Sequence, residues 1–142
     1  MNRRFALAIL ILGVAFLARV AGQFIQVVAP VEFFPPLEMW QGSNLPYPAL
    51  FAAQIGILLL IAWVYARMTA GRSVMPPRFA VAVIVLGAIY FSVMAVRLVL
   101  GLTTMADIKW FASPIPTIFH LVLATIVMVI GSYARGSPRK GA

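Results

Sequence analysis

The chain has 142 residues, of which 63% are apolar and only 10% are charged, and its mean hydropathy is +1.03. Soluble domains are roughly 45–50% apolar and about 25% charged, so this composition excludes an ordinary water-soluble globule. It also excludes a disordered chain, because disordered sequences are poor in aliphatic residues. The absence of cysteine excludes disulfides, thiolate metal sites and a cysteine nucleophile.

Four segments are long and apolar enough to cross a membrane, which requires about 20 residues for about 30 Å of hydrocarbon. They cover approximately residues 5–28, 48–66, 79–101 and 115–134. Clusters of proline and glycine separate the first two pairs, and proline interrupts helices because it lacks a backbone donor and has a fixed φ. We predict an all-α integral membrane four-helix bundle that forms a single transmembrane domain over residues 1–142.

The basic residues predict the orientation of this bundle. Eight of them precede the first segment, join the second to the third, or follow the fourth, whereas Lys109 alone lies in the other two connections. The eight are Arg3, Arg4, Arg67, Arg72, Arg78, Arg135, Arg139 and Lys140. Short loops rich in Lys and Arg stay in the cytoplasm, so we expect both termini to be cytoplasmic (N-in/C-in). Small size and the lack of an organelle signal favour a bacterial inner membrane.

The formal net charge of +8 therefore indicates topology rather than nucleic-acid binding. The same cytoplasmic residues can contact anionic lipid headgroups, and we expect membrane lipids, not nucleic acid, as partners. The first segment also resembles a signal peptide, with Arg3 and Arg4 before an apolar run and Val20-Ala21-Gly22 as a possible cleavage site. Because the apolar pattern continues beyond Gly22, we interpret the segment as an uncleaved span.

Few polar side chains fall inside the four segments, and most lie towards the outer surface. Arg19, Gln23 and Gln26 stand at i, i+4 and i+7, so they form a polar stripe on one helix face. A rise of about 1.5 Å per residue places Arg19 and Gln54 about 9 Å below the outer hydrocarbon edge. Lipid cannot satisfy such groups, so we expect them to face the bundle interior. The candidate binding residues are Arg19, Gln23, Gln54, Tyr90, Arg97 and His120.

Each candidate also has a structural interpretation. Arg97, about 3 Å deep by the same rise, could extend its guanidinium into the headgroups. Arg19 could form an ion pair with Glu32 or Glu38, and Gln54 or His120 could simply join helices by a hydrogen bond. Polar and aromatic residues of the two outer connections are candidates for a lid, the aromatic ones also for interfacial anchors: Glu32, Glu38, Trp40, Tyr47, Asp107 and Trp110.

The residue types exclude several chemistries. No GxxxxGK[ST] or GxGxxG motif is present, so a nucleotide-binding loop is not expected. His120 is the only histidine, which does not suffice for bis-histidine haem or for zinc, and we expect no metal and no cofactor. A triad of Ser113, His120 and Asp107 has no GxSxG motif to support it. The catalytic residues, and whether any reaction is catalysed, stay open.

The polar layer suits an anionic group attached to an apolar tail. Guanidinium groups provide planar donors for phosphate or carboxylate, and neighbouring aliphatic side chains accept an acyl or prenyl chain. We therefore predict a binding or transport-accessory module with an outer-leaflet pocket for an anionic or quinone-like amphiphile. One alternative is a structural subunit, with a membrane protein partner or a second copy of the chain. Another is an intramembrane lipid-modifying enzyme that uses His120 as its acid or base.

Overall fold

The computed structural model describes residues 3–42, 45–108 and 110–136, and this part of the chain contains helices and loops but no strands. Four long helices are present: α1 (Arg3–Val28), α3 (Tyr47–Thr69), α4 (Ala80–Leu102) and α5 (Pro114–Gly136). Each is long and apolar enough to cross a membrane, which indicates a helical membrane protein. The largest difference from the predicted bounds is at the end of α3, which continues to Thr69 instead of stopping near Ala66.

Two short elements were not predicted from the sequence. The helix α2 (Leu37–Trp40) lies in the connection between α1 and α3, and the 3₁₀ turn η1 (Pro77–Phe79) precedes α4. Both follow a proline, at Pro36 and Pro76, whose fixed φ favours entry into a helical turn. They are too short for apolar periodicity to reveal them.

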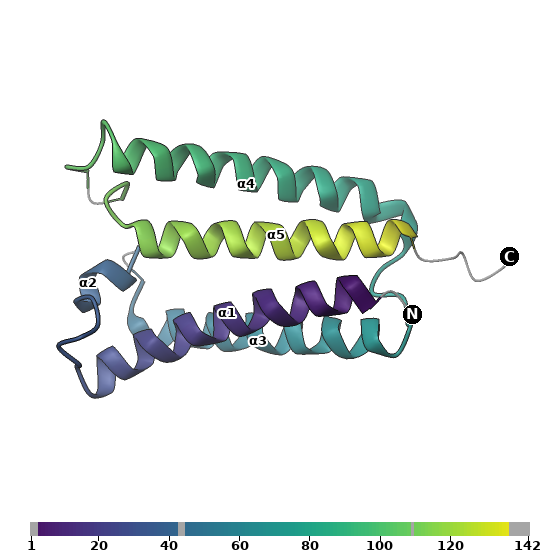
Figure 1. Cartoon of the computed structure of the whole chain (residues 1–142), viewed down its shortest axis with the longest axis horizontal. Coiled ribbons are helices and arrows are strands. Elements are labelled where there is room, and N and C mark those ends of the chain that lie inside the picture. Colours follow the sequence, from purple (N-terminus) through teal and green to yellow (C-terminus); the bar gives the residue numbers. More distant parts are fainter. Residues whose placement is uncertain (1–2, 43–44, 109, 137–142) are drawn as a thin grey trace, which may run out of the picture.

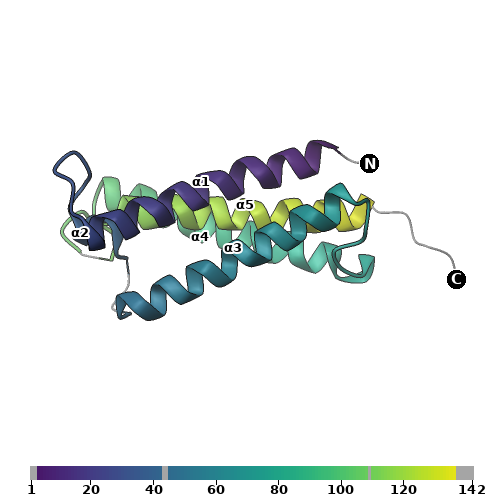
Figure 2. The ribbon, with the colours of Figure 1, turned by 90° about the horizontal axis from the view of Figure 1, so that it is seen from below.

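The long helices lie side by side in the spatial order α4, α5, α1, α3 (Figures 1 and 2). α4 packs along α5, and α1 packs against both α5 and α3, whereas α3 and α4 occupy opposite edges. α1 begins and α5 ends at the same end of the molecule, where the turn from α3 to η1 also lies (Figure 1). We call this the terminal end, and the end that carries α2 the loop end.

Small residues explain the close packing of α4 on α5. A Cβ added at Gly87 of α4 would lie 2.7 Å from Met128, and one added at Gly131 of α5 would lie 2.7 Å from Ile84. Ala124, one turn before Met128 on α5, is completely buried. Small residues at such positions let two helices approach closely.

The interior changes in character along the length of the helices. At the terminal end, Ile9, Val64 and Met68 are almost fully buried and form an apolar core with Tyr133. The Tyr133 hydroxyl donates to the Arg72 carbonyl at 3.0 Å, which joins the end of α5 to the turn after α3. Towards the loop end several of the buried residues are polar, and these polar residues form the candidate site.

Candidate ligand-binding site

The polar stripe of α1 faces the protein interior. Gln23 is completely buried, and Arg19 and Gln26 are buried beside it. Gln54 of α3 donates a hydrogen bond from Nε2 to Gln23 Oε1 at 3.1 Å. Gln26 Oε1 accepts from the Val31 backbone N–H at 3.1 Å, where the chain leaves α1. The structure thus joins two of the six candidates, Gln23 and Gln54, by a hydrogen bond. Gln26 binds the backbone at the start of the connection from α1 to α3.

Arg19 contacts the first outer connection through a backbone carbonyl. Its Nη2 donates to the Trp40 carbonyl oxygen at 3.0 Å, and within the described residues it makes no ion pair with Glu32 or Glu38. The Trp40 indole packs on Gly22, where an added Cβ would lie 2.8 Å from the ring, and its Nε1 donates to the Pro35 carbonyl. The Trp40 ring is therefore packed within the fold, because α2 turns it onto α1.

His120 and Tyr90 form a direct side-chain contact between α5 and α4. The Tyr90 hydroxyl and His120 Nδ1 are 2.5 Å apart, and the two rings meet edge to face. His120 Nδ1 is thus paired with a phenol and not with a carboxylate, so the arrangement does not match a Ser113–His120–Asp107 triad. Two groups that can exchange protons lie together here, within the helical part of the molecule.

Arg97 binds the connection between α4 and α5, and its charge acts on two other candidates, Tyr90 and His120. Its Nε and Nη2 donate to the Trp110 carbonyl oxygen at 3.1 and 2.5 Å, and its guanidinium stacks 4.0 Å from the Trp110 ring centroid. Arg97 is only 4% exposed, so its guanidinium is held by Trp110 within the fold. Its observed contacts anchor a loop.

A cavity of about 110 Å³ lies between α1, α3 and α5 at the depth of these polar residues. Three of the six candidates, Arg19, Gln54 and His120, line it; Gln23 and Tyr90 each contact a lining residue, and Arg97 does neither. The other lining residues are apolar or aromatic: Phe16, Leu50, Ala53, Ile57, Pro116, Phe119 and Leu123.

Several polar atoms next to this cavity have no hydrogen-bond partner in the described structure. They are Arg19 Nε, Gln23 Nε2 and Gln54 Oε1. A buried polar atom without a partner costs about 1–3 kcal/mol, so such atoms normally bind water or a ligand. Of these atoms, the donor Arg19 Nε and the acceptor Gln54 Oε1 belong to residues that line the cavity, so a small polar group would find one donor and one acceptor there, together with an apolar wall.

Sequence reasoning missed the aromatic contribution from α5. Phe119 lines the cavity, and its ring centroid lies 6.0 Å from the Arg19 guanidinium carbon. The neighbouring Pro116 packs against Gly42 of the first outer connection. The signal was the spacing of Pro116, Phe119 and Leu123 at i, i+3 and i+7, which places them on one helix face.

Among the described residues, no group of three His, Asp or Glu side chains is close enough to hold a metal ion. Comparisons with protein-family models, with curated proteins and with solved structures found no match for this chain.

Proposed function

We propose that the chain spans a bacterial inner membrane four times, with both termini in the cytoplasm. The support is twofold: the four long helices are apolar over a membrane-spanning length, and in the sequence eight basic residues against one precede the first span, join the second to the third, or follow the fourth. That bias is the pattern of short cytoplasmic loops. Under this orientation the polar cavity lies beneath the outer surface.

The native chain has no cysteine, so single cysteines can test this orientation. Ser73, in the turn after α3, and Thr104, after α4, are both exposed and lie at opposite ends. In intact cells, a membrane-impermeant maleimide should label Thr104→Cys and should label Ser73→Cys only after permeabilisation. The reverse pattern would contradict the proposed orientation.

For function, we propose a binding or transport-accessory module for an anionic or quinone-like amphiphile. The observation that supports it best is the cavity lined by Arg19, Gln54 and His120, with unpaired polar atoms beside it. Ligand pockets commonly combine an apolar lining with a few convergent polar groups, as here. At about 110 Å³ the cavity admits a polar head but not a whole amphiphile.

The position of the cavity indicates where the apolar tail of a bound amphiphile would lie. α1 packs on both α3 and α5, but the backbones of α3 and α5 are not packed closely together. Leu50 and Ile57 of α3 face Leu123 of α5 across the cavity. A chain attached to a head at Arg19 would leave between α3 and α5, against apolar side chains. Arg19 would bind the charged or carbonyl oxygen, with Gln54 and His120 orienting it.

Native mass spectrometry of protein extracted gently from its own membrane tests this proposal. Wild type should retain a defined small mass, and Gln54→Leu should reduce its occupancy about tenfold or more, since one buried hydrogen bond is lost and the partner amide is left unpaired. Arg19→Lys should also weaken retention, because an ammonium lacks the planar donor pair. The control is Arg78→Gln, which removes an exposed charge at the terminal end.

Equal retention by wild type, Gln54→Leu and Arg19→Lys would contradict the binding proposal. Retention of a protein in place of a small mass would favour the alternative, a subunit of a larger complex. One observation supports that alternative: Ala49, Ala53 and Gly56 form an exposed stripe of small residues on α3, with open space beside Gly56.

A further inference from the structure

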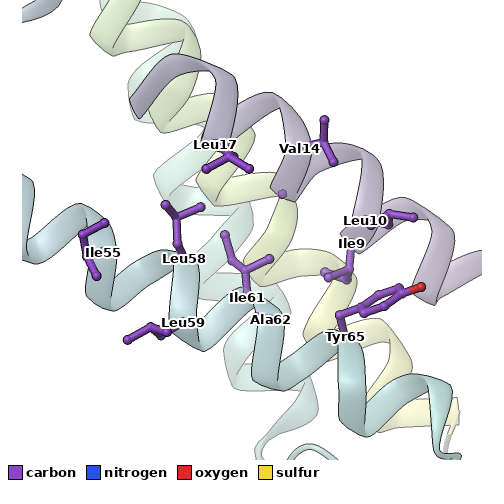
Figure 3. Close-up of a pocket in the computed structure, with 11 residues that line it drawn as sticks. Ile9, Leu10, Val14, Leu17, Ile55, Leu58, Leu59, Ile61, Ala62 and Tyr65 are labelled. Atoms are coloured by element: carbon purple, nitrogen blue, oxygen red, sulfur yellow. The ribbon is translucent and has the colours of Figure 1, made fainter. Parts of the chain in front are cut away.

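A second, entirely different cavity lies at the terminal end, between α1 and α3. It is a groove of about 420 Å³ lined almost wholly by apolar side chains. Figure 3 shows these side chains lying along the gap between the two helices, with Tyr65 extending from α3 towards the N-terminal part of α1. The residues that line the groove include Leu10, Leu17, Ile55, Ala62 and Tyr65. No residue of the polar cavity lines the groove, so the two sites are separate.

The groove has the length of one membrane leaflet. It extends along α3 from Ile55 to Tyr65, and ten residues at about 1.5 Å each give about 15 Å. The hydrocarbon core is about 30 Å thick, so this is about half of it. On α1 the groove runs from Ile9 to Leu17, that is, from near the terminal end to just past the middle of the helix.

A smaller cavity of about 200 Å³ continues the groove towards the terminal end. Leu10 and Tyr65 line both spaces, so the two are contiguous. Arg3 is the charged residue that lines the smaller cavity, and Thr69 also lines it. The Thr69 hydroxyl donates to backbone carbonyls of its own helix, so the charged donor at this point is the Arg3 guanidinium, with the Tyr65 side chain beside it in the lining.

Within the described residues, the terminal end has no acidic side chain to neutralise this guanidinium. The three acidic residues of the chain, Glu32, Glu38 and Asp107, all belong to the connections at the loop end. The combined space therefore has an apolar part of one-leaflet length and a positively charged end at the depth where lipid headgroups begin. A partner helix would use the apolar part but would leave the Arg3 cavity unfilled.

We propose that the groove and the Arg3 cavity together bind one anionic glycerophospholipid, with an acyl chain between α1 and α3 and the phosphate at Arg3. This inference rests on the proposed membrane insertion but not on the polar cavity near Arg19. It assigns the lipid to the leaflet at the terminal end, where basic residues attract anionic headgroups.

The test uses the purified full-length chain in detergent, with equal amounts of phosphatidylglycerol and phosphatidylcholine that carry the same acyl chains. Native mass spectrometry should show one phosphatidylglycerol bound in preference to phosphatidylcholine. Arg3→Gln should reduce that preference about fivefold, the factor expected from one basic contact to an anionic headgroup. Arg4→Gln is the matched control, since Arg4 is adjacent and exposed but lines neither space.

A second pair of variants tests the groove itself. Ala62→Trp should fill it and reduce retention of both lipids at least tenfold, whereas Ala82→Trp, on the exposed surface of α4, should leave retention unchanged. Equal lipid preference in Arg3→Gln and Arg4→Gln, or wild-type retention by Ala62→Trp, would overturn the proposal. Arg3 and Ala62 do not line the polar cavity near Arg19. The effect of Gln54→Leu on the small mass therefore tests the proposed function separately from these lipid-binding variants.

Discussion

Replacing Gly101 with alanine should destabilise the folded chain by about 3 kcal/mol or more, because the added methyl group meets main chain and not a flexible side chain. Gly101 lies in the last turn of α4, and its Cβ would overlap the carbonyl oxygen of Phe111. A side chain can rotate away from such a contact, but the Phe111 carbonyl cannot move without shifting the second outer connection. Thermal or denaturant unfolding in detergent, followed by circular dichroism, measures the loss.

The chain offers a matched control for this substitution. Gly56 is also in the interior of a long helix, and a Cβ there would have open space around it. Gly56→Ala should therefore be neutral or stabilising by up to about 1 kcal/mol, since alanine is the better helix former. If Gly101→Ala and Gly56→Ala had the same stability, the close approach of Phe111 to α4 would be contradicted.

Replacing Arg97 with methionine should cost about 2–4 kcal/mol, the second largest effect that we expect. The guanidinium makes two hydrogen bonds to the Trp110 carbonyl and stacks on the Trp110 ring. Hydrogen bonds from a charged donor contribute about 1.5–3 kcal/mol and a cation–π contact about 0.5–1 kcal/mol. Methionine keeps the apolar volume of the side chain but makes none of these contacts.

The measurement is an unfolding curve together with the tryptophan fluorescence of the folded protein, which should change as Trp110 loses the cation above its ring. Arg78→Met is the control, because Arg78 is exposed and its guanidinium lies 4.8 Å from a ring centroid, that of Phe79, without a carbonyl partner. We expect little change in that variant. Equal stability losses in both would mean that Arg97 does not anchor the loop.

Gly101 and Arg97 are four residues apart, so they lie on the same face of α4 and hold adjacent residues, Phe111 and Trp110. Their effects should not be additive, since the first substitution already releases the segment that the second would release. The combined variant should therefore lose less stability than the two single losses added together.

Composition and periodicity were sufficient to predict the four long helices and their ends. Membrane-length apolar runs bounded by proline are a local property, and every backbone donor in such a run can be satisfied within its own helix. The polar stripe of Arg19, Gln23 and Gln26 was predicted for the same reason, because helical periodicity alone places these residues on one face. Its orientation towards the interior follows from the cost of exposing such groups to lipid.

The partners of these polar residues depended on the tertiary structure. Arg19 binds the Trp40 carbonyl, not a carboxylate, because α2 brings that main-chain atom over α1. Every residue has a backbone carbonyl, so a sequence pattern cannot predict which of them an arginine will bind. Arg97 and Arg19 bind different main-chain carbonyls, those of Trp110 and Trp40, because the two arginines stand on different helices in the order α4, α5, α1, α3. The hydropathy pattern predicts only the depth of a residue along the membrane normal. Which helix lies next to which depends on side-chain shape, such as Gly87 against Met128, and only the packed chain decides that.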